Sequence, residues 1–411
     1  MPRFIAAILA VTICTSPAQA ADDAAPVFPL AQALERAHAT APALDAARAG
    51  VAAATAARAV AGLRPNPTVN GEYENVGGSR SYKAIEAPTQ TLTLGVPLEL
   101  GGKRSARLAV AEVASRRAAI AGAIAEADLR LSVTKTYIAA VAAERRLAIA
   151  RDQASVAEEA FQVAHVRVQA GRASPLEEQR AELVRANAGT AAAKAARLVE
   201  LTRLDLASRI GGTIAGPLDQ SWFERIEPAE MKGSDRGAAL VLADARSAEA
   251  LAAAQVRLAE SQRVPDVTVT GGARRLPTNG NVAAVVGFSV PLPLFNDGRA
   301  AVEQANAERK RATAERAVAE TELAQAIAHA ETELANQAAA VRNATGPALS
   351  AAREAARIAR IGYREGKFGQ LDLLDAERGL ADARNAATEA FAAYHNARAE
   401  LDRLTTAFGK E

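Results

Sequence analysis

The stretch from Lys103 to Ala170 contains no proline and a single glycine, Gly122. A continuous α-helix over this stretch would be about 100 Å long, because each residue adds about 1.5 Å. Its larger apolar residues recur in steps of three, four and seven, which is the spacing of a coiled-coil face. A helix of this length does not fit inside a compact domain. The sequence therefore predicts an elongated protein built on long helical hairpins.

Directly before this helix, the sequence "TLTLGVPLEL" from Thr91 to Leu100 alternates apolar residues with small or polar ones. We expect four strands, at 67–75, 90–100, 266–274 and 282–294. Each has roughly the 9–11 residues that a tilted strand needs to cross a bilayer. One face of the last strand is apolar and the other is small or polar, as lipid outside and water inside would require. That apolar face comprises Val282, Ala284, Val286, Phe288, Val290, Leu292 and Leu294.

The chain is internally duplicated. Val96-Pro97 recurs at Val290-Pro291, and further correspondences follow in the same order. Their spacing stays at about 195–200 residues, which indicates a repeat architecture. Each copy is expected to contain helix, strand, loop, strand, very long helix, sharp turn and helix. The predicted organisation is a signal peptide at 1–20, a first repeat at 21–212 with a helical hairpin at 103–210, a linker at 213–236, and a second repeat at 237–411 with a hairpin at 299–408.

Proline and glycine mark where the helices should begin, end or bend. The opening helix is expected over 30–62, where Gly62 and the following prolines stop it. Gly346-Pro347 lies inside the second long helix and should break or kink it, with no counterpart in the first repeat.

Residues 1–20 have the pattern of a secretory signal peptide, in which Arg3 and an apolar run precede a small-x-small cleavage site. The only cysteine, Cys14, lies in this segment, so disulfides, thiol catalysis and cysteine-metal sites are not expected in the mature chain. No apolar stretch long enough for a membrane helix follows. Lys and Arg together number 49 and Asp and Glu 47, which leaves no basic surplus for binding nucleic acid.

Four strands cannot close a barrel, and an open sheet edge in hydrocarbon would leave backbone groups unpaired. The chain is therefore expected to oligomerise. Two copies would supply eight strands and a nearly filled interior, whereas three would supply twelve strands and leave a lumen. The expected fold class is mainly α with a transmembrane β-barrel. The alternative from the residues alone is a soluble β-sandwich patch on a helical stalk, because half-buried soluble strands also alternate.

The duplicated plan resembles the TolC-like outer membrane factors across essentially the whole mature chain. The motifs "PLELGGKR" and "VPLPLF" resemble the heavy-metal-efflux, CzcC-type branch, and "YREGKFGQLDLLDA" resembles the stretch at the periplasmic end of the family's tunnel. The resemblance implies a homotrimer with a twelve-strand outer membrane barrel that continues into a periplasmic α-helical tunnel. It also implies docking onto a periplasmic adaptor (membrane fusion) protein and an inner-membrane RND-type pump.

Asp372 and Asp375 lie three residues apart at the start of the last helix and therefore share a face. In a trimer they would form two rings of carboxylates, and the resemblance assigns the matching positions to the narrow, cation-attracting entrance. The alternative is that they cap the helix and interact with its dipole. Their counterparts in the first repeat are Glu177 and Arg180.

The resemblance also implies bonds between the two helical turns that hold the entrance closed. Gly171 and Gly366 are expected to make these turns. Tyr363 matches the motif tyrosine, and a bond from Tyr363 to Glu177 is the predicted latch. Phe368 stands where some relatives carry an arginine, so a second link is expected to be absent or supplied by Arg364 or Lys367.

No arrangement of residues suggests catalysis, a cofactor or a resident metal. The four histidines occur singly and are expected to be surface or packing residues. The predicted function is a passive outer membrane exit duct of a tripartite efflux system, for small solutes or metal cations, driven by the partner pump. A duct for protein secretion is a related alternative, and a periplasmic coiled-coil adaptor or stalk is an alternative of another class.

Overall fold

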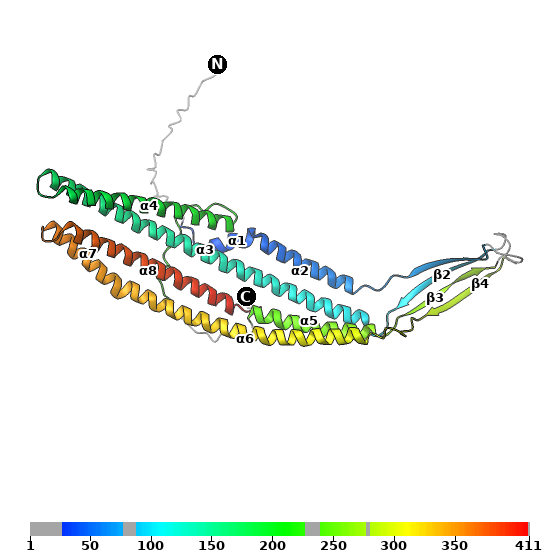
Figure 1. The fold of residues 1–411 in the computed structure, drawn as a ribbon. Helices are drawn as coiled ribbons and strands as arrows, with labels where there is room; N and C mark the ends of the chain where they lie inside the picture. Colours follow the sequence, from blue (N-terminus) through cyan, green and yellow to red (C-terminus); the bar gives the residue numbers. More distant parts are fainter. Residues whose placement is uncertain (1–26, 77–87, 227–238, 277–279, 410–411) are drawn as a thin grey trace, which may run out of the picture.

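The computed structural model describes residues 27–76, 88–226, 239–276 and 280–409, and the expected signal peptide lies outside them. The molecule is elongated, with the helices at one end and the sheet at the other (Figure 1). The elements, in chain order, are α1 Leu30–Thr40, α2 Pro42–Ala61, β1 Thr68–Glu74, β2 Thr89–Leu98, α3 Lys103–Gln169, α4 Pro175–Arg209, α5 Leu240–Gln262, β3 Val267–Arg275, β4 Val282–Ser289, α6 Arg299–Asn343, the π-helical turn η3 Ala344–Ala348, α7 Leu349–Arg364 and α8 Gln370–Thr405.

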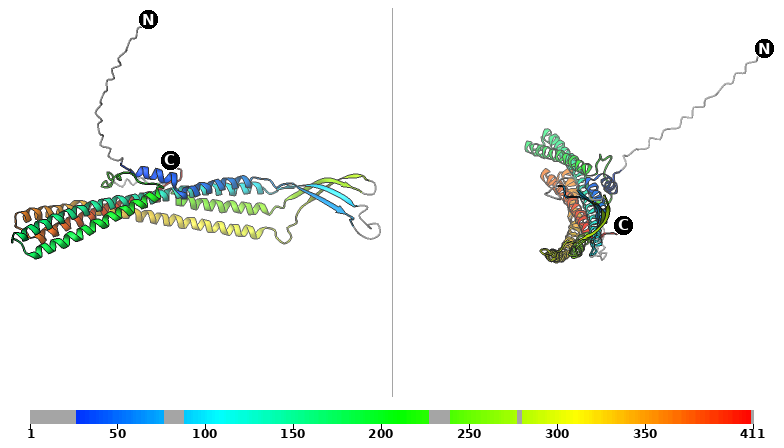
Figure 2. Two further views of the ribbon diagram at one scale, coloured as in Figure 1. Left: turned by 90° about the horizontal axis from the view of Figure 1, so that it is seen from above. Right: turned by 90° about the vertical axis from the view of Figure 1, so that its right-hand side faces the viewer.

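The predicted long helix is confirmed, because α3 runs without interruption for 67 residues. Helix α3 packs against α4 toward the hairpin turn and against α2 toward the sheet. In the second half of the chain, α6 packs against α8 toward the turn and against α5 toward the sheet. Figure 2 shows the helices running nearly parallel along the rod. Alanine occupies many buried positions of α3, and its small side chain allows the helix axes to approach closely.

The opening helix is not continuous, so the expectation of one helix over 30–62 is wrong. It is divided into α1 and α2 at Ala41, whose backbone is extended at φ −73° and ψ 118°. Pro42 explains the break, because its ring disfavours the helical conformation of the preceding residue and it has no N–H to donate.

The second long helix passes through Gly346-Pro347 without ending. Residues 344–348 form a π-helical turn between α6 and α7, and Pro347 lies inside it. A π turn widens the backbone spacing and thereby accommodates a residue that cannot donate a helical hydrogen bond. The predicted irregularity is therefore present, as a local widening rather than a break.

The four strands form one antiparallel sheet in the order β1-β2-β3-β4. Strand β4 ends at Ser289, so the expected strand to residue 294 is too long. Apolar residues continue to alternate beyond Ser289, but Pro291 and Pro293 have no N–H for a ladder.

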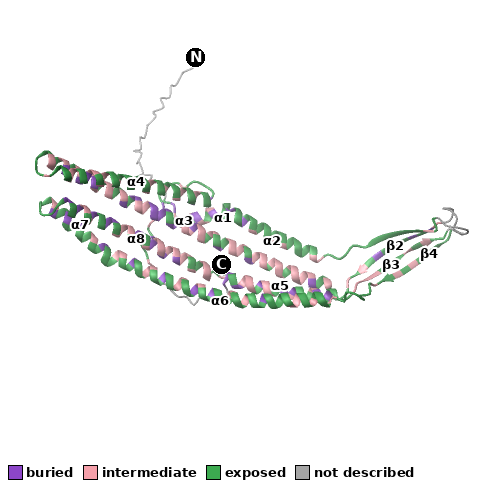
Figure 3. Ribbon diagram, viewed as in Figure 1, coloured by how far each residue is buried: buried purple, intermediate pink, exposed green. Residues whose placement is uncertain are grey.

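The main hydrophobic core lies midway along the rod, where buried residues gather on α3 and α8 (Figure 3). Tyr137 is completely buried, and its hydroxyl donates to the Phe28 carbonyl at 2.6 Å and accepts from the Asp219 N–H at 2.9 Å. Burial raises the pKa of Tyr137 to about 12. The described part of the predicted linker, residues 213–226, packs onto this core through Trp222 and Phe223.

Candidate functional site

The first hairpin turn joins α3 to α4 at one extreme end of the rod (Figure 1). Gly171 adopts φ +67°, and the Arg172 N–H donates to the Arg167 carbonyl at 2.8 Å, which closes the C-terminus of α3. Ser174 then caps α4 through a bond from the Leu176 N–H to its Oγ at 3.2 Å. A left-handed glycine and a capped helix together fix the sharp turn that the sequence predicted.

The second hairpin turn joins α7 to α8 at the same end. Gly366 adopts φ +71°, and the Lys367 N–H donates to the Gly362 carbonyl at 2.7 Å. The ring of Phe368 lies so close to Gly362 that an added Cβ there would be 2.0 Å from Phe368 Cδ2. Phe368 is thus a packing residue of the turn.

Asp372 and Asp375 both lie exposed on the first turns of α8. The Asp372 carboxylate accepts from the Gly369 N–H at 2.9 Å, so it does cap the helix. Capping occupies one of its oxygens and leaves the side chain exposed. The two readings of Asp372, as a cap and as a charge at an entrance, are therefore compatible.

Tyr363 packs against the first hairpin, because the Arg167 guanidinium lies over its ring at 5.5 Å from the centroid. Its hydroxyl is buried and has no hydrogen-bond partner, so the expected bond to Glu177 is not formed in this structure. Glu177 is half-buried in the first turn of α4. The expected gate partners Arg180, Arg364 and Lys367 are all exposed.

The sequence reasoning missed a network near the first turn that includes a histidine. His165 Nδ1 lies 2.7 Å from Glu178 Oε1, and its Nε2 lies 2.8 Å from Gln169 Nε2. His165 is therefore part of a tie between α3 and α4 rather than an isolated surface residue.

One heptad further from the turn, Arg185 on α4 stacks over Phe161 at 4.6 Å and pairs with Glu158 and Glu182. The hydrogen bond from Arg185 lowers the pKa of Glu182, and bonds from Gln162 and Arg185 lower that of Glu158. Both ties could have been inferred from the sequence. Glu158 and Arg185 lie at equal distances along the chain on either side of the turn, and so do His165 and Glu178.

The second hairpin has its own tie between α7 and α8. The Arg360 guanidinium binds the Glu377 carboxylate with two hydrogen bonds, one of them 2.7 Å from Nη2 to Oε2. The Glu377 side chain is only 10% exposed, whereas that of Arg360 is 50% exposed. A nearly buried carboxylate thus depends on one arginine.

At the opposite end of the rod, the register places the apolar and polar side chains on different faces of the sheet. Val69 pairs with Leu94, and Val269 with Phe288, whereas the alternate positions carry mainly threonine, glycine and other small or charged residues. The apolar face includes Val69, Tyr73, Leu92, Leu94, Val96, Val269, Val286 and Phe288, all of them exposed. The sheet therefore presents an unpartnered apolar face opposite a polar one.

Within the described ranges, no group of three or more His, Cys, Asp or Glu side chains could hold a metal ion. Over the same part of the chain, no helix is long and apolar enough to cross a membrane.

Comparison with known proteins identifies the family. Residues 33–212 and 238–407 match the family described as outer membrane efflux protein. The chain belongs to this family. It is 31% identical over 335 residues to the nickel and cobalt resistance protein CnrC of Cupriavidus metallidurans, with 75% of this chain and 74% of that protein covered.

This outer membrane efflux protein is also 28% identical over 302 residues to the cobalt-zinc-cadmium resistance protein CzcC of the same organism, with 72% of each chain covered. The solved structure of CusC, described in terms of transmembrane channel formation, has a TM-score of 0.78 at 17% identity and covers 92% of each chain. The efflux protein therefore has the channel fold that the sequence predicted, and it is located in the outer membrane.

Proposed function

We propose that three copies of this efflux protein form the outer membrane exit channel of a tripartite system that exports metal cations. The observation that carries the proposal is the sheet, which has one apolar and one polar face and stands at the end of two long hairpins. Lipid against the apolar face and water against the polar face would satisfy both sets of side chains. The partner pump, of the RND type, would supply the energy.

The sheet edges support assembly from several copies. In the described residues, β1 pairs with β2 and β4 with β3, so the outer edges of β1 and β4 have no partner. In hydrocarbon each unpaired backbone group costs several kcal/mol. Pairing of β4 in one copy with β1 in the next removes both edges, and three copies close a ring of twelve strands with a lumen.

The cargo class follows from the relatives and from the charge at the hairpin turns. CnrC and CzcC are named for resistance to nickel, cobalt, zinc and cadmium, and both align over more than two thirds of this chain. Asp372 and Asp375 would repeat in each copy around the entrance and raise the local concentration of cations.

A periplasmic adaptor would bind near the hairpins. A groove of about 300 Å³ lies between α3/α4 and α7/α8. Its lining includes Asp152, Arg360, Arg378, Asp382 and Arg384. Charged side chains of both signs suit a partner helix with a complementary charge pattern.

Export complementation tests the function. A strain that lacks this gene should become sensitive to cobalt, zinc, cadmium or nickel salts, and the cloned chain should restore growth. A chain whose expression restores resistance to organic drugs but not to any of these cations would overturn the proposed cargo.

Conductance in planar bilayers tests the entrance. The double variant Asp372→Ala and Asp375→Ala should lower the cation preference of the channel, because six carboxylates per trimer are removed. Asp382→Ala, an exposed acid further along α8, is the control and should leave selectivity unchanged. Equal selectivity in the double variant and the wild type would place these carboxylates outside the conduction path.

The latch is tested in the same assay. We propose that the Tyr363 hydroxyl bonds to Glu177 in the assembled resting channel. Tyr363→Phe together with Glu177→Gln should then raise resting conductance, while Tyr73→Phe in the sheet should not. No rise would discard the latch.

A further inference from the structure

The two repeats connect their sheet strands to their long helices in different ways. In the first repeat, residues 99–102 join β2 to α3, and Arg107 binds the Glu99 carboxylate with two hydrogen bonds. Lys103 Nζ lies 2.7 Å from Asp266 Oδ1, and that carboxylate also accepts from the Leu100 N–H. This connection is short and tied to the neighbouring elements by charge.

In the second repeat, residues 290–298 join β4 to α6, and we call this segment the β4–α6 connection. Leu292 is 74% exposed, Leu294 79% and Phe295 fully exposed. The corresponding Leu98 and Leu100 of the first repeat are 46% and 42% exposed. Figure 2 shows the connection swinging out at the end of α6, away from the other helices. Three large apolar side chains are therefore exposed and do not pack against the helices.

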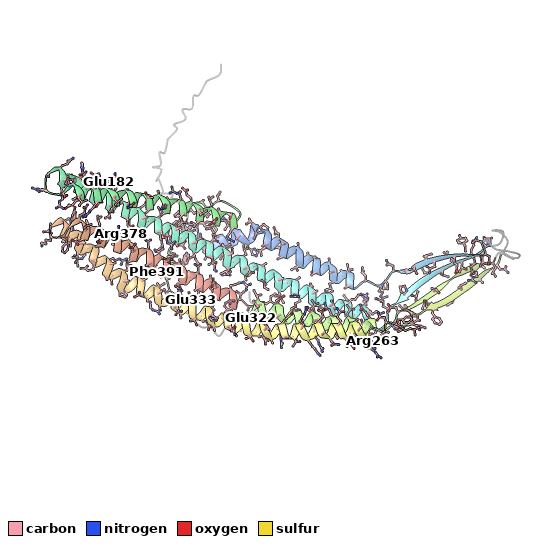
Figure 4. The ribbon with its side chains drawn as sticks, viewed as in Figure 1. Glu182, Arg263, Glu322, Glu333, Arg378 and Phe391 are labelled. Atoms are coloured by element: carbon pink, nitrogen blue, oxygen red, sulfur yellow. The ribbon has the colours of Figure 1, made fainter. Side chains whose placement is uncertain are left out.

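The β4–α6 connection has a defined shape. The Leu294 N–H donates to the Leu292 carbonyl at 2.9 Å, a γ-turn centred on Pro293. The Asp297 carboxylate accepts from the Arg299 N–H at 3.0 Å, and Arg263 donates to the Asp297 carbonyl at 3.3 Å. Figure 4 labels Arg263 at this junction. The backbone thus holds the apolar side chains in place rather than letting them collapse onto the helices.

These side chains continue the apolar face of the sheet. Val286 and Phe288, 83% and 80% exposed, lie on that face of β4. Leu292 and Leu294 extend the same alternation toward the helices. Polar groups begin at once after Phe295, with Asn296, Asp297 and Arg299. An apolar band that ends in an aromatic ring and charged residues is the usual pattern at a membrane–water interface.

We propose that Leu292, Leu294 and Phe295 insert into the membrane leaflet nearer to the helices and anchor the channel at that depth. The occupant is lipid rather than a second copy, because Pro291 and Pro293 have no N–H with which to extend strand pairing. The Asp297–Arg299 ion pair at 2.8 Å would then lie at headgroup level. The inference rests on the proposed channel function, and it assigns an interfacial role to one repeat only.

Site-directed spin labelling of the reconstituted full-length channel tests the anchor. Cys14 is the only cysteine and lies in the expected signal peptide, so the mature channel itself is expected to provide a background without thiols. Single cysteines replace Leu292, Leu294 or Phe295, with Val286→Cys as the reference on the apolar face and Val285→Cys as the reference on the polar face. The collision rates of each label with oxygen and with a neutral nickel chelate are then compared.

The anchor predicts that labels at 292, 294 and 295 are severalfold more accessible to oxygen than to the chelate. The label at 286 should behave in the same way, whereas the label at 285 should be more accessible to the chelate. High accessibility to the chelate at all three, with 286 still lipid-exposed, would overturn the anchor and leave the channel intact. Low accessibility to both reagents would also overturn it, in favour of a protein contact. A label at 286 that is not exposed to lipid would contradict both the proposed channel and the proposed anchor.

Discussion

The two hairpins have nearly the same length and turn on matching glycines, yet they are held together differently. The first hairpin has a continuous α3, and its end is tied by the half-buried side chains of Arg185, Glu158 and Glu182, which are 39–47% exposed. The second contains a π turn and depends on Glu377, which is nearly buried. Exposed pairs contribute little individually, whereas a buried carboxylate that loses its partner is costly. Loss of a partner should therefore cost more at Glu377 in the second hairpin than at Glu158 or Glu182 in the first.

The largest effect is expected from deletion of both Gly346 and Pro347. A π turn holds one residue more than an α turn, so loss of the first residue restores a regular helix, and loss of the second rotates α7 by about 100° relative to α6. Arg360 would then no longer face Glu377, and export should fall to the level of the empty vector in the complementation assay.

Deletion of Gly346 alone, combined with Pro347→Ala, is the matched control. It should retain export, since a regular α turn in place of the π turn keeps α7 in phase with α6. Normal export after the double deletion would show that the phase of α7 does not set the position of the second hairpin.

The next effect concerns the Arg360–Glu377 ion pair of the second hairpin. Glu377→Gln should lower the free energy of local opening of α7 and α8 by about 1.5–3 kcal/mol, the usual contribution of hydrogen bonds to charged groups. Amide hydrogen exchange around the α7–α8 turn measures it. Glu182→Gln in the first hairpin should change exchange around the α3–α4 turn much less, because this side chain is 40% exposed. Equal changes in both hairpins would contradict the comparison.

A smaller effect is expected from pH. The pKa values of Glu158 and Glu182 are lowered by Gln162 and Arg185, so their stabilisation is present above the ordinary carboxyl pKa and is lost as the pH falls through the lowered values. Exchange around the first turn, measured in His165→Gln to remove the imidazole, should be steady at neutral pH and rise only below about pH 4.

Arg185→Gln is the control for this titration. It should show faster exchange already at neutral pH and a weaker response to acid. A response of wild-type strength in this variant would assign the acid sensitivity to other groups.

The smallest effect is expected at the cap of α4. Ser174→Ala should cost about 0.5–2 kcal/mol of local stability, while Ser174→Gly should cost only a few tenths. Exchange of the first amides of α4 reports the difference. Exchange in Ser174→Ala equal to that of the wild type would show that the Oγ of Ser174 contributes nothing to the turn.

The sequence alone predicted the features that depend on local pattern. The length of α3 followed from the absence of proline, both turns from their glycines, and the four strands from alternation. Proline explains the two errors of length, since Pro42 divides the opening helix and Pro291 limits β4. In both places the hydrophobic pattern continues past the proline, but the missing N–H of the proline determines where the helix or strand ends.

Contacts across the hairpins were predicted less well, because they depend on which residues face each other after folding. Arg360–Glu377 and the His165 network could have been found by pairing residues at equal distances from each turn. The unpartnered hydroxyl of Tyr363 could not, since its burial depends on packing against α3. The acidic residues Asp372 and Asp375 were located by motif, and their part in conduction stays a prediction.

Glycine on the polar face of the sheet has a consequence for stoichiometry. A Cβ added at Gly272 would lie 2.0 Å from the Leu92 carbonyl oxygen, and one at Gly95 or Gly287 would lie 2.9 Å from a threonine hydroxyl. Side chains on that face would reduce the curvature of the sheet, and in the proposed ring a less curved sheet would need more strands to close. The absence of three side chains on this face would thus limit the number of copies in the proposed channel.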